Sequence, residues 1–256
     1  MRCAGAGPER EESTTLRDEW IAREPGAALR SESVQVWRLR LAATPERQAQ
    51  LASVLSADER ERARRFRRDE DRRRFVVCRA TLRALVGSCL ASPPAELRFR
   101  YGEHGKPALD GDAGLEFNVS HSGDVALVAI ALDRRIGVDV ERHRSVDIDD
   151  LAARFFSDDE RRGIVGSEGA EKLARFYACW TRKEAYLKAT GRGLSLPLDR
   201  FSVSIVEPAA VVRDADDPDA AIRWQLATLA AGAGYSAAVA IEGGGTSIEL
   251  CEFPAL

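Results

Sequence analysis

The sequence lacks the features that would send a chain into or across a membrane. None of its apolar runs approaches the roughly 18 residues that a membrane-spanning helix needs, and no charged-then-apolar signal segment opens it. The five cysteines are odd in number and scattered, and no two form a Cys-x-x-Cys pair. We therefore expect a cytoplasmic protein with reduced, mostly buried thiols and no membrane partner.

The chain also lacks an excess of positive charge. Its 38 Lys and Arg residues are fewer than its 41 Asp and Glu residues, which gives a net charge of −3. This balance argues against a protein that coats nucleic acid, although it leaves local basic patches open. With 256 residues, of which 45% are hydrophobic, the chain can bury the core of one large or two small globular domains.

Three short blocks carry most of the residues with chemical potential. They read FNVSHSG at residues 117–123, GVDVE at residues 137–141 and WTRKEAYLK at residues 180–188. The first two blocks have the β-branched and apolar residues of strands, and the third has apolar residues at helical spacing. The blocks are close enough in sequence to meet in one site.

Three acidic residues in these blocks could form a cation site. Asp139 and Glu141 are two residues apart, so a strand would point both carboxylates to the same face. Glu184 could bring a third carboxylate from a helix. Hard Mg²⁺ takes oxygen ligands and is commonly shared with substrate phosphates. The acids therefore indicate Mg²⁺ bound together with a pyrophosphate.

Basic residues accompany the acids. Lys183, Lys188 and His121 can donate hydrogen bonds to phosphate oxygens. Each residue also has an ordinary structural interpretation, because Glu184 next to Lys183 and one turn before Lys188 could form exposed helix ion pairs worth about 0.3–0.5 kcal/mol. The combination, more than any single residue, favours chemistry at a pyrophosphate.

Together the three blocks resemble those of the Sfp-type (surfactin-type) 4'-phosphopantetheinyl transferases. The order and separations are similar, and the resemblance covers about residues 56–206. It implies Mg²⁺-dependent transfer of 4'-phosphopantetheine from coenzyme A to a serine of an acyl or peptidyl carrier protein, which converts the apo carrier to the holo form and releases 3',5'-ADP. The attacking serine belongs to the partner, so the enzyme needs no nucleophile of its own.

The resemblance also implies roles for individual residues. Asp139, Glu141 and Glu184 would hold Mg²⁺, and Glu184 would also act as the general base. Ser120 and His121 would contact phosphate at the end of a strand. Lys188 would bind the transferred phosphate, and Lys183 would support the pyrophosphate. The catalytic set implied is His121, Glu184 and Lys188.

A basic run and a Gly-Lys-Pro segment imply the rest of a coenzyme A site. Residues 60–79 contain ten arginines against four acids, most of them expected on a solvated helix surface. In the resembling family, basic residues near here and in Gly105-Lys106-Pro107 contact coenzyme A, especially its 3'-phosphate. The matching residues are Arg62, Arg74 and Lys106. Outward-facing arginines of this run, and Phe155-Phe156, are candidates for carrier docking.

Short matches between distant segments predict an internal duplication. Residues 157–161 repeat residues 56–60 and residues 176–179 repeat residues 75–78, both at a shift of 101. We expect an α+β fold of two similar halves related by a pseudo-twofold axis, each with helices packed on a small antiparallel sheet, and a site in the cleft between them. At this shift Arg83 would occupy the place of Glu184. Such a duplication is consistent with a working monomer.

The same patterns divide the chain into three parts. We predict a flexible N-terminal extension at residues 1–33, with a possible short helix around Trp20, an N-terminal half at 34–142 and a C-terminal half at 143–256. The alternation of residues 34–41 predicts a first strand. Thr44-Pro45 predicts a helix start, and Ser56-x-x-Glu59 a capping box.

Two other classes of function remain open. A metal-dependent nuclease also uses clustered carboxylates with a lysine, and the arginine run could hold a nucleic-acid backbone. Against this, the lysine follows Glu184 by four residues and the net charge is negative. A protein that docks carrier domains without catalysis is the other alternative, although all three carboxylates and both lysines are present. Mg²⁺-dependent release of 3',5'-ADP from coenzyme A would separate these possibilities.

Overall fold

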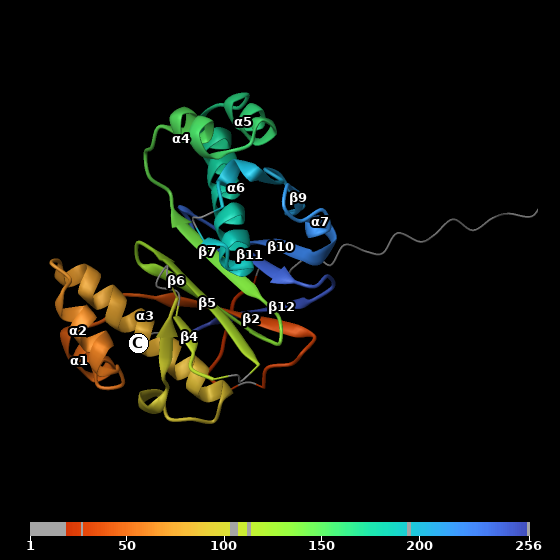
Figure 1. Cartoon of the computed structure of the whole chain (residues 1–256). Coiled ribbons are helices and arrows are strands. Elements are labelled where there is room, and N and C mark those ends of the chain that lie inside the picture. The colour runs from red at the N-terminus through yellow and green to blue at the C-terminus, as the bar shows by residue number, and fades with distance from the viewer. Residues whose placement is uncertain (1–18, 27, 103–106, 112–113, 194–195, 255–256) are drawn as a thin grey trace, which may run out of the picture.

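Two groups of strands and helices repeat the same order along the chain (Figure 1). The computed structural model describes residues 19–26, 28–102, 107–111, 114–193 and 196–254. The first group is β2 (Ser33–Arg40), α1 (Pro45–Ala52), α2 (Ala57–Arg64), α3 (Asp69–Cys89), β3 (Phe99–Tyr101), β4 (Pro107–Leu109), β5 (Leu115–Ser122) and β6 (Val125–Leu132). The second is β7 (Ile136–Arg142), α4 (Ile148–Phe155), α5 (Asp158–Val165), α6 (Gly169–Thr190), β8 (Phe201–Val203), β9 (Val211–Asp214), β10 (Trp224–Leu229) and β11 (Tyr235–Glu242).

The two groups also pair their strands in the same way. In the first half the strand order is β2-β6-β5, and in the second half it is β7-β11-β10, with antiparallel pairing throughout both. The last strand, β12 (Ser247–Glu252), joins the first sheet by running parallel to β2. The matching orders confirm the predicted α+β fold of two similar halves.

The position of β7 changes the predicted division of the chain. We expected residues 34–142 to form the first half, which would include β7. Instead β7 pairs with β11 and is the counterpart of β2, so the second half begins after the turn at residues 133–135. The physical reason is that each half needs an opening strand to complete its three-stranded sheet. Strand β12 follows the second half in sequence but pairs with β2 in the first sheet.

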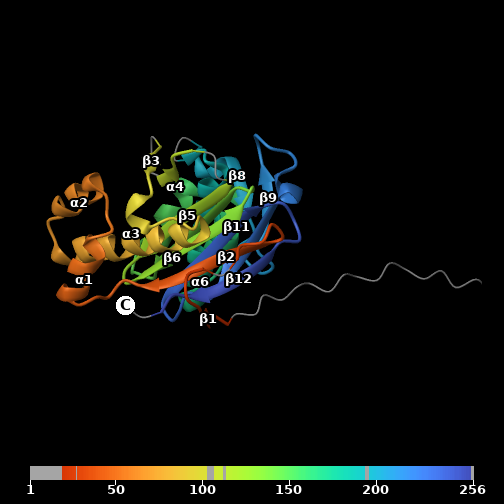
Figure 2. The ribbon, with the colours of Figure 1, turned by 90° about the horizontal axis from the view of Figure 1, so that it is seen from below.

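The sheets lie against each other, with the long helices on their outer faces (Figures 1 and 2). Period-two alternation decides which side chain enters which layer. On β6, Leu127 and Ala129 enter the core between the sheets, whereas Val128 and Ile130 pack toward α3. On the second sheet, Ala238 and Ala240 face α6. No helix in the described part of the chain is both long and apolar enough to cross a membrane.

The predicted helix starts are confirmed in the structure. Thr44 caps α1 by accepting a hydrogen bond from the Arg47 amide, and Pro45 is its first residue. Helices α2 and α5 both begin with a capping box, in which Glu59 and Glu160 accept hydrogen bonds from the backbone amides of Ser56 and Ser157. The repeated capping box is the clearest sequence trace of the duplication.

Each capping-box glutamate is buried and paired with a cation from the long helix of its half. Glu59 Oε2 lies 2.6 Å from Arg83 Nε, and Glu160 Oε2 lies 2.8 Å from Lys183 Nζ. Both cations also donate to two backbone carbonyls beyond the helix end. Arg83 is therefore the counterpart of Lys183, not of Glu184 as predicted. One residue fewer separates α5 from α6 than α2 from α3, so the helices repeat at a shift of 100, which places Ala84 opposite Glu184.

Part of the predicted flexible extension is bound to the body of the protein. Ile21 and Ala22 form strand β1, which runs parallel to β12. Trp20 Nε1 donates to the Ala230 carbonyl at 2.7 Å, and the guanidinium of Arg38 lies over the Trp20 ring. The expected short helix around Trp20 is therefore replaced by a strand edge. Residues 1–18 lie outside the described part of the chain.

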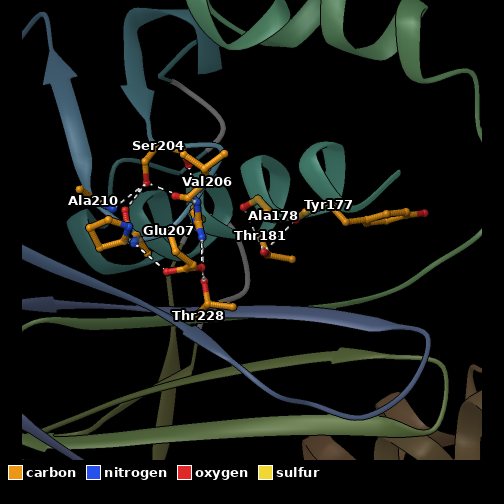
Figure 3. A network of polar contacts seen from close by, with 11 residues as sticks. Tyr177, Ala178, Thr181, Ser204, Val206, Glu207, Ala210 and Thr228 are labelled. Atoms are coloured by element: carbon orange, nitrogen blue, oxygen red, sulfur yellow. Dashed lines mark hydrogen bonds and ion pairs between the residues drawn. The ribbon is translucent and has the colours of Figure 1, made fainter. Parts of the chain in front are cut away.

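Buried Arg182 joins α6 to the segment that follows β8. Figure 3 shows Ser204, Val206 and Glu207 of that segment beside α6. The Arg182 guanidinium donates to the carbonyls of Ser204 and Val206 and pairs with Glu207. Thr228 on β10 bonds to both Arg182 and Glu207. These contacts fix α6 at its middle, immediately before the residues that face β7.

Candidate active site

Two carboxylates share one face of β7. Ile136, Val138 and Val140 point into the core between the sheets, so the intervening Asp139 and Glu141 point toward α6. Asp139 is 3% exposed, and Glu141 is half-buried. The structure thus places these two acids on one face, as their spacing predicts.

A glycine allows α6 to approach this face closely. A Cβ atom at Gly137 would lie 2.1 Å from the carbonyl oxygen of Ala185 and 2.4 Å from the amide of Ala189, which no side chain tolerates. Because β7 has no side chain there, α6 rests directly on the strand. Glu184 and Lys188, one helical turn apart and next to this contact, are brought close to the carboxylates.

Lys188 is bound to the acid on the strand rather than to the acid on its own helix. Its Nζ lies 2.6 Å from Asp139 Oδ1 and 3.0 Å from Ser120 Oγ. Among the described residues, no ion pair joins Lys188 to Glu184, although the spacing of four residues permits one. The lysine therefore belongs to the cleft and is partly buried there.

Polar side chains of β5 span the gap to β7. Every second residue of β5 accepts a hydrogen bond from every second amide of β7, always 20 residues further along the chain. The pairs are Asn118 with Val138 at 2.9 Å, Ser120 with Val140 at 3.4 Å and Ser122 with Arg142 at 3.1 Å. This set of three bonds, here called the side-chain ladder, joins the halves at the site.

The two serines of the ladder also hold the two acids of β7. Ser120 Oγ donates to Asp139 Oδ1 at 2.8 Å, and Ser122 Oγ donates to Glu141 Oε2 at 2.7 Å. A serine hydroxyl can accept and donate at once, which is what both positions require. The FNVSHSG block thus orients the carboxylates of the GVDVE block.

The three acids repel one another electrostatically. Burial raises the pKa of Glu141, and the neighbouring Asp139 raises it further. The hydrogen bond from Ser122 acts against this and lowers the pKa of Glu141. Burial also raises the pKa of Glu184, Asp139 raises it further, and Lys188 lowers it. Such a cluster of partly desolvated negative charge is stabilised by a cation.

The carboxylates of Asp139, Glu141 and Glu184 are the kind of ligand that a hard divalent cation prefers, but in the described structure they do not converge on one point. Asp139 Oδ2 is buried and has no hydrogen-bond partner, so one carboxylate oxygen is available. The Glu184 carboxylate makes no hydrogen bond or ion pair with a described residue. No group of three acids, histidines or cysteines in the described part of the chain converges as a ready cation cage. The Lys188 ammonium instead contacts Asp139 and partly balances its charge.

A basic cavity of about 550 Å³ opens beside the acids. It lies between α2, α3, the end of β5 and the end of β7. Arginines come from both halves, and the Arg62 guanidinium lies over the Phe75 ring. The lining residues are Arg62, Phe66, Asp71, Arg74, Phe75, His121, Ser122, Gly123, Arg142 and Arg144. Five basic side chains against one acid suit an anionic ligand.

His121 lines this cavity from the face of β5 opposite Ser120. The residue is exposed within the cavity, but partial desolvation by the cavity walls lowers its pKa, and the positive charges of Lys188, Arg74 and Arg62 lower it further. The imidazole is therefore neutral near pH 7 and can donate one hydrogen bond. The structure brings His121, Arg62 and Arg74 together, as the sequence predicts. The charge of Arg74 is balanced by ion pairs with Glu70 at 2.5 Å, Asp124 at 3.0 Å and Asp71 at 3.6 Å.

For Lys183 and Phe156 the structure differs from the sequence prediction, and Lys106 is not described. Lys183 was expected beside the pyrophosphate, but its side chain is fully buried under Glu160 and the carbonyls of Leu198 and Phe201. Consecutive helix residues point about 100° apart, so Lys183 and Glu184 cannot both face the cleft. Lys106 lies outside the described residues. Phe156, a candidate for carrier docking, is buried in the core of the second half.

Sequence reasoning missed several residues of the site. Ser122 and Asn118 belong to a quoted block, yet only their alternation with Ser120 could have indicated the ladder. Arg142 and Arg144 follow the GVDVE block directly and face the same cavity. Their signal was the charge that continues past Glu141 at the end of the strand.

Comparison with known proteins agrees with this geometry. The family model for the 4'-phosphopantetheinyl transferase superfamily matches residues 135–240, and the model for the 4'-phosphopantetheinyl transferase N-terminal region matches residues 41–132. The break between the two matches falls at the turn before β7. The family models thus divide the chain where the sheets do.

Individual relatives match over most of the chain. The chain is 38% identical to the 4'-phosphopantetheinyl transferase HetI of Nostoc sp. strain PCC 7120 over 237 residues, which cover 90% of this chain and 96% of that protein. It is 31% identical to the 4'-phosphopantetheinyl transferase Sfp of Bacillus subtilis strain 168 over 194 residues, or 76% and 85% of the two chains. The chain therefore belongs to the 4'-phosphopantetheinyl transferase superfamily and is of the Sfp type.

Proposed function

We propose that this protein transfers 4'-phosphopantetheine from coenzyme A to a serine of an acyl or peptidyl carrier protein and releases 3',5'-ADP. The observation that carries the proposal is the junction of two features: a cluster of three acids with Lys188, and a basic cavity that opens beside it. Coenzyme A has phosphates at both the adenosine and the pyrophosphate, so it needs positive charge at two places. Family membership supports the same reaction.

The acids are proposed to hold Mg²⁺. Asp139, Glu141 and Glu184 would supply the oxygen ligands, and the unpartnered Asp139 Oδ2 supports this assignment. When bound, Mg²⁺ supplies positive charge that offsets charge growing on the leaving pyrophosphate oxygen. The remaining work falls to side chains of this chain, which bind the phosphates and accept a proton.

The basic residues divide between the two ends of the substrate. Arg62, Arg74 and His121 line the cavity and would bind the 3'-phosphate of the adenosine. Lys106 is proposed to contribute to the same end. Lys188, held at the acids through Ser120 and Asp139, would bind the phosphate that is transferred.

Glu184 is the proposed general base for the serine of the carrier. Its pKa is raised by burial, which increases its affinity for a proton relative to an exposed glutamate. A cation beside it would act in the opposite direction and lower the pKa. The hydroxyl proton of the incoming serine would pass to Glu184, directly or through one water molecule.

The test is the Mg²⁺-dependent release of 3',5'-ADP from coenzyme A when an apo carrier protein is present. We expect release only when carrier, coenzyme A and Mg²⁺ are together, and loss of release with EDTA. A nuclease would cleave nucleic acid under the same conditions without a carrier. A docking protein would bind the carrier and release nothing, and either result would overturn the proposal.

A further inference from the structure

Ser122 touches both halves of the protein at the site and is half-buried there. Its Oγ accepts a hydrogen bond from the Arg142 amide at 3.1 Å and donates one to Glu141 Oε2 at 2.7 Å. It is the last residue of β5 and lines the basic cavity. The residue therefore connects the strand pairing, the acid cluster and the cavity.

The side-chain ladder explains why a short hydroxyl is needed. The side chains of Asn118, Ser120 and Ser122 take the place of backbone carbonyls as acceptors for the amides of β7. Strands β5 and β7 are therefore held in a fixed register, with these side chains filling the gap between the two backbones. Of these three side chains, the two serines are the ones that also donate to a carboxylate of β7. The rung at Asn118 holds the strand alone, whereas the rungs at the serines hold the strand and a carboxylate.

The two carboxylates do not depend on their serines equally. Asp139 is held by Ser120 and also by Lys188. The Glu141 carboxylate, among the described residues, receives its one hydrogen bond from Ser122. A glutamate side chain has three rotatable bonds, so this single bond selects one orientation and leaves Oε1 unoccupied by a donor. Removing it would free the carboxylate to rotate.

We propose that Ser122 is a positioning residue that orients the Glu141 carboxylate for a divalent cation. The inference rests on the proposed function, because it takes Glu141 as a ligand of Mg²⁺. Mg²⁺ requires near-ideal octahedral geometry, and a ligand that must first be ordered binds it more weakly. Ser122 would thus raise cation affinity without contacting the cation.

The test measures Mn²⁺ binding to the full-length protein by electron paramagnetic resonance, with saturating coenzyme A and no carrier protein, so that no turnover occurs. We expect Ser122→Ala to weaken Mn²⁺ binding by roughly 10- to 100-fold, the usual effect of losing a partner of a metal ligand. Ser122→Thr, which retains the hydroxyl, should restore most of the affinity. In transfer assays the apparent Mg²⁺ requirement should rise for Ser122→Ala.

Asn118→Ala is the matched control, because it removes a rung of the ladder that touches no carboxylate. It should lower thermal stability but leave Mn²⁺ affinity near that of the wild type. Equal Mn²⁺ affinity for Ser122→Ala and wild type would overturn the positioning role. Equal losses for Asn118→Ala and Ser122→Ala would show that the ladder acts only through the fold. If the wild type bound no Mn²⁺, the cation site of the proposed function would be wrong, and the role of Ser122 would fall with it.

Discussion

The two halves of the molecule share a frame but differ in what they place on it. In each half a capping-box glutamate is buried against a cation of the long helix, Glu59 with Arg83 and Glu160 with Lys183. One residue further along, the first half has Ala84 and the second half has Glu184. The two halves therefore share a helix held on a sheet, and the position next to this shared ion pair is one at which they differ chemically.

The strands show the same contrast. On β7, Gly137, Asp139 and Glu141 face the long helix. On β2, the counterpart strand, Trp37 and Leu39 pack toward the long helix of the first half. A polar face is tolerated on β7 because Ser120, Ser122 and Lys188 donate to one oxygen of each of its two carboxylates.

The largest expected effect tests the difference between Glu184 and Ala84. Glu184→Gln should lower kcat for carrier modification by about 10²–10⁴-fold, because it removes the proposed general base and a charged ligand of the cation. The matched change in the first half, Ala84→Gln, should leave kcat near the wild-type value. Steady-state kinetics with an apo carrier protein and circular dichroism of both variants would measure this. Near-normal turnover by Glu184→Gln would show the proposed mechanism to be wrong.

The second prediction tests the similarity of the halves. Arg83→Met and Lys183→Met should each destabilise the fold by about 3–5 kcal/mol, because each removes the cation that lies closest to a buried glutamate. Denaturant unfolding would measure the loss. At a temperature where the variants are folded, Lys183→Met should keep the wild-type KM for coenzyme A. A raised KM with unchanged stability would instead indicate that Lys183 binds the pyrophosphate of coenzyme A.

These cases show how far the sequence alone reaches. Period two along a strand is local, so it correctly predicted that Asp139 and Glu141 share a face. The capping boxes were likewise local, and they revealed the duplication. The match of Arg83 with Lys183, and not with Glu184, depended on one residue missing between two helices, which no local pattern records. Ser122 was missed because its value lies in two bonds to a strand 20 residues away.

The third prediction concerns how closely α6 lies on β7. Gly137→Ala would place a Cβ atom 2.1 Å from the Ala185 carbonyl, so the helix must move. Overpacking of this kind costs about 1–3 kcal/mol, and the displaced Glu184 and Lys188 should lower kcat as well. Gly244→Ala is the control, since a Cβ there meets no atom within 4 Å. Thermal unfolding and kinetics that fail to distinguish the two variants would contradict this packing account.

The smallest effect concerns pH and the acid cluster. The pKa values of Glu141 and Glu184 are raised in the folded protein, so their ionised forms are less favourable folded than unfolded. For these groups, stability is present at low pH and is lost as pH rises through the raised pKa. The metal-free wild type should therefore gain Tm relative to Glu184→Gln as pH falls from neutral toward the usual range of glutamic acid. A Tm difference that stays constant with pH would show that neither burial nor repulsion raises the pKa of Glu184 in the folded protein.

The most direct test of the whole account is the intact mass of an apo carrier protein after incubation with this protein, coenzyme A and Mg²⁺. The account predicts a gain of one phosphopantetheine mass with the wild type, and no gain with EDTA or with Asp139→Ala. A full gain by Asp139→Ala would contradict the assignment of the acid cluster. No gain across several carrier types, with no binding of coenzyme A, would contradict the proposed reaction itself.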